Sequence, residues 1–448
     1  MIIVIIFSIW IYDANHLDII DEHLIRGEEV VDFPLTLPYL KLNTEVGSLH
    51  PLSARGYLKS DSLFSFRISP ILNYPVTNLV QIRLAPFLTF GDDPSYPLPK
   101  WKGKVRGDFE EAGIALNLRP FHLLIGRMRR RWGVENSLIL SGWNYPFDNF
   151  GFRFELRPIL FSYFHGRLER LTGDSSLIPL YGDSILSRYL VGHRIELRLS
   201  RRLHLGFTET CLYATPGGID LTYLNPLLLY YEVQWNKEAW EGERVDDNIV
   251  WAFDFRLDLP PTLYFQLMLD DYQYEPPPDS EPNEIGFIAG IKVPIGRFTI
   301  SAEYTRLNNF CYDTQRPYLR YAYLGQPLGY YHGPDLDDLR IRGRFYRHPL
   351  LLQITAFRHR KGEGRFNDPW PSGIFPRPDF LTGVVEEGYG VEGGLGLYLR
   401  NLLIKIETGV HHYDNYHNQT GRERLIPVVK GVITLPIPFP SSGRSGLE

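Results

Sequence analysis

Two stretches of the chain, joined by a short turn, show a period of two. From Leu339 to Phe345, apolar side chains alternate with Arg340, Arg342 and Arg344. The turn Arg347-His348-Pro349 follows, and a second such stretch runs from Leu350 to Arg358. This is the repeat of a β-strand, whose successive side chains point to opposite faces of a sheet. The pair therefore predicts a hairpin with one apolar and one charged face.

The same hairpin pattern recurs along the chain. The short connections carry turn signals at Pro70–Pro75, Arg119-Pro120, Arg157-Pro158, Arg201-Arg202, Pro260-Pro261, Pro294–Gly296 and Arg400-Asn401. The first strand is predicted at Tyr39–His50 and the last at Leu425–Ile437. The strands have the roughly 9–11 residues that a tilted membrane-spanning strand needs. We count about 18 strands, within a range of 16–18.

Short and long connections alternate between these strands. The long ones are predicted at Gly91–Gly107, Met128–Asn149, Thr215–Arg244, Tyr272–Glu284, Leu307–Asp338 and Lys361–Gly388. Short turns at one end and long loops at the other are typical of an outer-membrane barrel, whose lumen is polar. A soluble β fold is the alternative, but it does not predict this asymmetry. The pattern therefore favours an all-β fold, a transmembrane antiparallel β-barrel in the cell outer membrane.

Composition agrees with this fold class. Aromatic residues make up 14% of the 448 residues, yet the mean hydropathy is only −0.19. No run of about 18 apolar residues is present, so no transmembrane helix is predicted. A net charge of −5 gives no basic footprint for nucleic acid. Cys211 and Cys311, the two cysteines, are treated as unpaired.

The sequence divides into a barrel and its flanks. Residues 1–14 form an apolar, signal-like segment. Residues 15–36 are predicted to contain a short periplasmic helix, at His16–Glu29. The barrel covers 37–439, and a polar tail covers 440–448. We expect a monomer, inserted into outer-membrane lipid by the barrel-insertion machinery. Such barrels often end on an aromatic residue that serves as the insertion signal, whereas here Phe439 is followed by the polar tail.

The long loops are rich in aromatic rings, carboxylates and amides. Sugar rings stack on aromatic side chains, and sugar hydroxyls bond to Asp, Asn, Glu and Arg. The predicted glycan-binding residues are Trp143, Tyr145, Asp148, Tyr223, Asn225, Asp271, Tyr330, Tyr331, Asp335 and Asp337. Tyr272 and Trp370 belong to the same loops. The alternative is that these aromatics only pack the loops together at the end of the barrel.

Charged side chains on the strands admit two interpretations. Asp270 and Asp271, with Glu209 or Glu303, could form the carboxylate pair of a glycosidase. An ion-paired network in the lumen is favoured, and it is predicted to include Arg127, Arg194, Asp254, Glu303 and Arg342. No catalytic residue is assigned. No cofactor is expected, because nucleotide-binding and nucleophile motifs are missing from the sequence.

The histidines give no sign of a metal site. They are His193, His204, His332, His348, His359, His411 and His412, among others. None of them shows a ligand spacing tied to one strand or helix. We therefore predict no metal.

Between about residues 110 and 345, the chain resembles the Wzi-like capsule assembly proteins of the bacterial outer membrane. The matching pieces, in order, are Gly126-Arg127, Trp132-Gly133, Leu138–Ser141, Arg188–Leu190, Gly192–Arg194, Glu209, Tyr223–Pro226, Asp247-Asn248, Asp254, Asp270-Asp271, Glu303–Thr305, Gly325–Gly329 and Gly333–Asp335. The resemblance implies an occluded 18-stranded barrel with a periplasmic helical portion. It also implies a lectin-like, non-enzymatic role in binding or organising capsular or extracellular polysaccharide. A porin or substrate-specific channel with the same wall is the alternative, and a membrane-embedded glycan hydrolase is a third.

Overall fold

The computed structural model describes residues 48–59, 64–77, 79–91, 105–142, 144–171, 186–241, 247–272, 283–371, 380–399 and 402–438. The predicted signal-like segment, the periplasmic helix and the polar tail lie outside these residues. So does most of the strand expected at Tyr39–His50.

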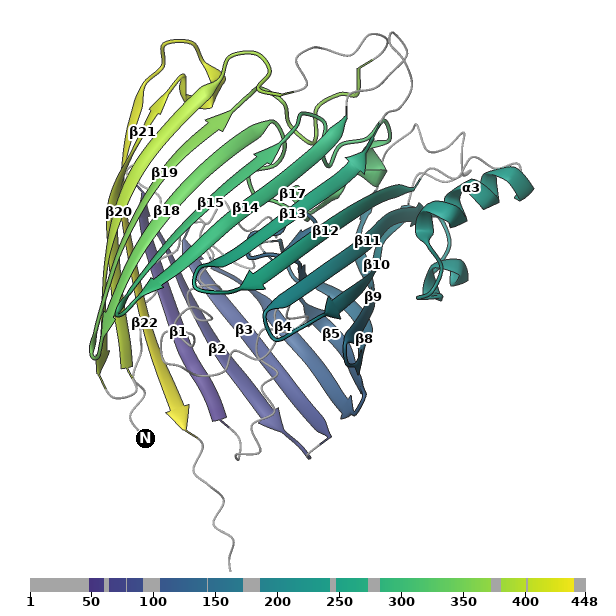
Figure 1. The fold of residues 1–448 in the computed structure, drawn as a ribbon, viewed down its shortest axis with the longest axis horizontal. Helices are drawn as coiled ribbons and strands as arrows, with labels where there is room; N and C mark the ends of the chain where they lie inside the picture. Colours follow the sequence, from purple (N-terminus) through teal and green to yellow (C-terminus); the bar gives the residue numbers. More distant parts are fainter. Residues whose placement is uncertain are drawn as a thin grey trace, which may run out of the picture.

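The described residues form one antiparallel sheet of 18 strands, as predicted (Figure 1). The strands are β1 (Ser48–Lys59), β2 (Phe64–Pro75), β3 (Val80–Gly91), β4 (Val105–Leu118), β5 (Phe121–Met128), β8 (Phe147–Leu156), β9 (Ile159–Leu171), β10 (Leu186–Arg198), β11 (Leu203–Thr215), β12 (Asn248–Asp258), β13 (Thr262–Asp271), β14 (Glu284–Ile295), β15 (Phe298–Leu307), β18 (Leu336–Arg347), β19 (Leu350–Lys361), β20 (Glu386–Leu399), β21 (Leu402–Asp414) and β22 (Arg424–Pro438). Each strand pairs with the next, and β22 pairs with β1. The sheet therefore closes on itself.

The short turns lie mostly where the sequence places them. Strands end and begin on either side of Arg119-Pro120, Arg157-Pro158, Pro260-Pro261 and His348-Pro349. The turn predicted at Pro70–Pro75 is wrong. Strand β2 continues to Pro75, and the chain turns at 76–79. The β1–β2 register shifts between His50 and Ser53, next to the position of Pro70, where a proline without an N–H is tolerated.

Side-chain exposure is the inverse of that in a soluble protein. Outward-facing apolar residues are open to the surroundings, with Ile125 60% exposed and Ile354 58% exposed. Polar side chains such as Gln266, Glu196 and Arg344 are buried inside. An apolar exterior needs lipid around it, and a closed barrel satisfies every backbone group within lipid. No helix among the described residues is long and apolar enough to cross a membrane.

The long connections carry short elements of their own and gather at one end of the barrel (Figure 1). These are β6 (Arg131–Trp132), β7 (Leu140–Ser141), η2 (Leu221–Leu224), α3 (Tyr230–Glu241), η3 (Pro317–Leu319), β16 (Ala322–Tyr323), β17 (Gln326–Pro327) and η4 (Tyr416–Asn418). Helix α3 projects outside the wall beside β11 (Figure 1). The connection with α3 covers the outer surface of the barrel and not its mouth.

Candidate functional site

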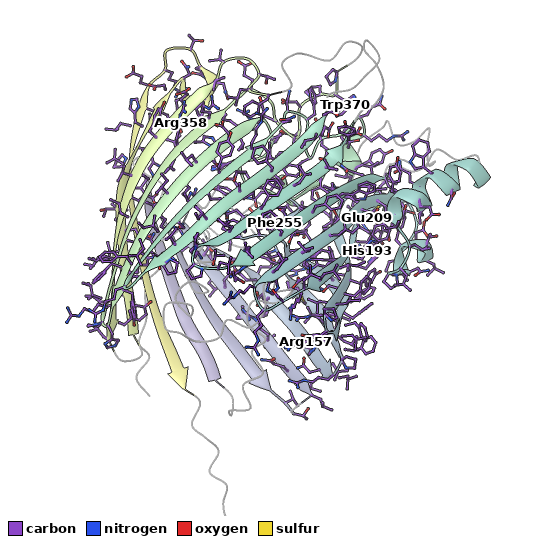
Figure 2. The ribbon with its side chains drawn as sticks, in the orientation of Figure 1. Arg157, His193, Glu209, Phe255, Arg358 and Trp370 are labelled. Carbon is purple, nitrogen blue, oxygen red and sulfur yellow. The ribbon has the colours of Figure 1, made fainter. Side chains whose placement is uncertain are left out.

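The loop end of the barrel carries the features that can recognise a ligand. Figure 2 shows Arg157 at the turn end and Trp370 among the long loops at the opposite end. Long loops are on the extracellular side in outer-membrane barrels. Two of them, 129–146 and 308–335, fold back into the barrel, and we call the pair the plug.

The first plug loop is held by polar side chains of the inner wall. The Oε1 of Gln266, on β13, accepts hydrogen bonds from Leu138 N at 2.7 Å and Ser137 Oγ at 3.1 Å. Asn136 donates to Glu303, on β15, at 2.5 Å. Alternation along β13 and β15 turns these two wall residues inward. The inward polar face thus satisfies the loop backbone and amides, which would otherwise be buried without partners.

The second plug loop packs on the first through tyrosine hydroxyls. Tyr312 donates to the carbonyl of Leu138 at 2.6 Å, and Tyr321 donates to the carbonyl of Ile139 at 3.0 Å. From the wall, Arg188 on β10 donates to the carbonyls of Tyr318, Arg320 and Ala322. A guanidinium offers five donors in a fixed fork, so one side chain binds three carbonyls of this loop.

The plug supplies half of the residues in the largest apolar core of the described residues. Its fully buried members include Trp132, Leu138, Ile139, Leu140, Cys311, Tyr312, Tyr321 and Leu328, packed against inward wall residues Val250, Ala252, Met268 and Ile288. At the loop end the barrel is therefore filled by apolar side chains. The polar lumen predicted from the strands is found toward the turn end. The run Leu138-Ile139-Leu140 inside a loop was the one sequence signal of this core.

The predicted lumen residues divide between the interior and the rim. Arg194 bonds to both carboxylate oxygens of Asp254, at 2.6 and 2.8 Å, inside the barrel. Glu303 accepts from Tyr264 at 2.7 Å and holds the plug. Arg342 is half-buried on β18. Arg127, at the loop end of β5, bridges Asp108 and Asp148 at 2.9 and 3.0 Å.

Three tyrosines expected to face a glycan are buried, so the expectation of exposed rings is wrong for them. Tyr223 stacks on Tyr213 with ring centroids 4.4 Å apart, on the outer wall beneath α3. Tyr330 donates to Asp338 at 2.6 Å inside the plug. Tyr145 lies against Phe87. Their rings pack against other protein groups, which is the alternative that loop composition left open.

Asp335 and Asp337 are also buried, and both bind protein groups. Asp335 accepts from Gly364 N at 2.9 Å and from the Thr382 hydroxyl at 2.6 Å, so it joins the plug to the connection after β19. Asp337 binds Arg360 and accepts from the Tyr304 hydroxyl. These carboxylates hold loops together and are not open to a sugar.

Other predicted residues remain open at this end. The side chain of Asp148 is 65% exposed, and Asp271 and Tyr331 are half-buried. Asn225 is exposed too, but on the α3 connection outside the wall. Next to Asp271, Tyr272 is 62% exposed. Trp370 is half-buried with its ring 5.5 Å from that of Phe310. Trp143 lies outside the described residues. The accessible surface of the loop end thus still combines aromatic rings with carboxylate groups.

Two of the carboxylates considered for glycan hydrolysis, Glu209 and Asp270, lie on opposite faces of the wall. Alternation along β11 turns Glu209 to the outer face, where it accepts from Trp251 Nε1 at 2.9 Å and Tyr230 N at 2.9 Å. Figure 2 shows Glu209 and His193 beside α3. Asp270 faces inward and accepts from Tyr312 N in the plug. Glu209 therefore lies across the wall from Asp270, and the geometry gives no acid–nucleophile pair from these two residues.

Asp313 makes the packing of the plug sensitive to pH. Burial raises the pKa of this carboxyl to about 6, partly offset by its hydrogen bond from Arg320 at 2.7 Å. Between about pH 4 and pH 6 the carboxyl of Asp313 is therefore protonated in the native plug but ionised in the unfolded loop. The stability of the plug should fall as pH rises from 4 to 7, by at most about 3 kcal/mol. Hydrogen exchange in 308–321, corrected for intrinsic rates, should be faster at pH 7 than at pH 5. In Asp313→Asn the exchange rates at pH 5 and pH 7 should be equal. An unchanged pH dependence in this variant would show that Asp313 is not the group responsible.

Comparison with known proteins shows the fold. No family model matches the chain, and neither does any curated protein. Among solved structures, it is similar to Wzi, an outer membrane protein involved in group 1 capsule assembly in Escherichia coli and described as a carbohydrate binding β-barrel. The TM-score is 0.58 at 14% identity, over 86% of this chain and 84% of Wzi. The outer membrane protein opdK from Pseudomonas aeruginosa gives a TM-score of 0.51 at 10% identity, over 88% of this chain and 99% of opdK.

The chain has the fold of outer-membrane β-barrels, as the sequence predicts, and its place in the outer membrane follows from that fold. The likeness to Wzi-like proteins holds as a structural match. At 10–14% identity it carries no residue roles across, so the role of this barrel is argued below from its own geometry.

Proposed function

We propose that this barrel is a non-enzymatic, glycan-binding protein that holds or organises capsular or extracellular polysaccharide at the cell surface. The plug is the observation that carries the proposal. Loops 129–146 and 308–335 fill the loop end with buried apolar side chains and contact inward residues of the wall. A barrel filled in this way offers a platform to the outside, where a pore would need an open path.

The groups on this platform suit a polysaccharide. The rings of Tyr272, Tyr331 and Trp370 offer apolar faces for the C–H side of a sugar. Asp148 and Asp271 offer carboxylate oxygens that accept hydrogen bonds from hydroxyls, and Asn225 offers an amide on the α3 connection outside the wall. An aromatic surface with a few placed polar groups is the usual composition of a ligand site. The fold shared with Wzi, a carbohydrate binding barrel by description, supports the same role.

A substrate-specific channel is the second candidate. The observation in its favour is the charged interior toward the turn end, where Arg194, Glu196 and Asp254 face the lumen. A permeating solute would have to displace the plug at the other end. Conductance of the wild-type protein separates the two candidates.

Cells that lack this protein should shed polysaccharide into the medium, and the wild-type chain should restore its attachment. The double variant Tyr272→Ala/Trp370→Ala should reach the outer membrane normally and fail to restore it. Losing about 1.4 kcal/mol of stacking weakens binding tenfold. The measurement is the ratio of cell-bound to free polysaccharide. Binding of the purified polymer to the detergent-solubilised barrel gives a second readout.

Arg157→Ala, at the turn end of the barrel, is the matched control and should restore attachment fully. Unchanged attachment in cells without the protein would remove the proposal. Full rescue by the double variant would instead show that these two rings are not the binding surface.

A further inference from the structure

Strand pairing brings together three potential metal ligands that are far apart in the sequence. Asp338 on β18 and His359 on β19 are direct register partners, and His332 lies in the plug loop just before β18. One ligand atom from each of the three residues lies within 4.8 Å of the others. This is the one group of three such residues found within the described ranges.

Distances within the group suit a small cation. His359 Nδ1 is 2.6 Å from Asp338 Oδ1, and His332 Nε2 is 3.9 Å from Asp338 Oδ2. Nitrogen and oxygen ligands bind Zn²⁺ at about 2.0–2.2 Å in a tetrahedron, which separates them by about 3.3–3.6 Å. All three separations are within 4.8 Å, so side-chain shifts of about 1 Å would bring the ligand atoms to tetrahedral spacing.

Neighbouring side chains orient two of the three potential ligands. The Tyr330 hydroxyl donates to Asp338 Oδ2 at 2.6 Å and fixes the orientation of the carboxylate. Hydrogen bonds from neighbouring groups, such as this one from Tyr330, orient the ligands of metal sites. The ring of Tyr331 also packs against His332, with ring centroids 4.0 Å apart. His332 is half-exposed, with a side-chain exposure of 39%, so a cation can enter from the loop end.

Two cationic side chains lie nearby, and both have partners. Arg340 donates to the Tyr331 hydroxyl at 2.8 Å. Lys361 donates to the carbonyl of Gly364 at 3.0 Å and to that of Pro334. Their charge opposes a cation and lowers its affinity. The two imidazoles and the carboxylate form the ligand type that selects zinc-like metals over Mg²⁺ or Ca²⁺.

We propose that His332, Asp338 and His359 form a site for a divalent transition-metal ion of the zinc class. The ion would tie the plug loop to the β18–β19 hairpin and keep a fourth coordination position open toward the loop end. The metal would act as a cross-link between plug and wall. This proposal does not depend on glycan binding.

Cobalt(II) is a direct probe of the site, because tetrahedral Co²⁺ absorbs visible light. The full chain, purified in detergent without a histidine tag and treated with chelator, should bind one Co²⁺ per molecule. Zn²⁺ should displace it. Zn²⁺ should also slow hydrogen exchange in 325–335. His332→Gln and His359→Gln should abolish the absorption, and Tyr330→Phe should weaken binding by about tenfold through its lost hydrogen bond.

His411→Gln is the matched control. His411 also bonds to an inward carboxylate, Glu392 at 2.9 Å, but belongs to no three-ligand group among the described residues. It should bind Co²⁺ like the wild type. Failure of the wild type to bind stoichiometrically would overturn the proposal. So would equal binding by His332→Gln, a half-exposed loop position whose substitution should leave the barrel folded.

Discussion

A valine in place of Gly329 is expected to make the barrel conduct ions, if the plug closes the wild type as we propose. A Cβ at this position would overlap the carbonyl oxygen of Leu138 and the hydroxyl of Tyr312, which are two of the groups that join the plug loops. The carbonyl belongs to backbone that is itself bonded to Gln266, so it cannot move aside without breaking the plug. Overpacking of this kind costs about 1–3 kcal/mol. The wall is untouched, so the loops should separate while the barrel remains.

Single-channel recording in planar bilayers measures the effect. The wild type should show no steady current, and Gly329→Val should show resolved conductance steps. Gly393→Val is the control, because Gly393 is also in the barrel but a Cβ there meets no atom within 4 Å. A folded Gly329→Val protein without current would show that this contact does not close the barrel. A wild type with a large steady current would favour the channel over the glycan-binding platform.

The wall of the barrel could be predicted from the sequence because its rule is local. Each strand has lipid on one face, so apolar residues recur at every second position, as at Ile341 and Ile354. Short turns then fix the register of each hairpin. The turn after β2 was missed because Pro70 and Pro75 look like turn residues. The irregular β1–β2 pairing accommodates Pro70 within the strand instead.

The plug could not be predicted, because its contacts join distant parts of the chain. Leu138 N donates to Gln266, which is 128 residues away in the sequence, and no residue near Leu138 predicts that partner. The burial of Tyr223 likewise depends on Tyr213, which is on the outer face of β11. Loop composition identifies aromatics suited to sugars, but only packing decides which of them remain open. Asp338 and His359 meet for a similar reason, through the β18–β19 register, and the plug loop adds His332.

Alanine at Asp335 is expected to release the connection after β19 from the plug. The carboxylate accepts from Gly364 N, Thr382 N and the Thr382 hydroxyl, at 2.9, 3.1 and 2.6 Å. Hydrogen bonds to a charged group contribute about 1.5–3 kcal/mol each, and their loss leaves the N–H groups of Gly364 and Thr382 without this acceptor. Asp335 also has a positive φ of 59°, a conformation that costs alanine a further 1–2 kcal/mol or so. Hydrogen exchange in 362–371 and 380–385 should therefore accelerate more than a hundredfold.

Asparagine separates the two causes at this position. Asp335→Asn tolerates the left-handed backbone and keeps one acceptor oxygen, so its exchange rates should lie between those of the wild type and Asp335→Ala. Asp148→Ala, a change at an exposed carboxylate, should leave exchange in these segments unchanged. If Asp335→Ala exchanged like the wild type, the carboxylate would not be the tie between the two loops. If it exchanged faster but still retained polysaccharide on cells, the surface formed by Trp370 would bind sugar without a fixed plug beneath it.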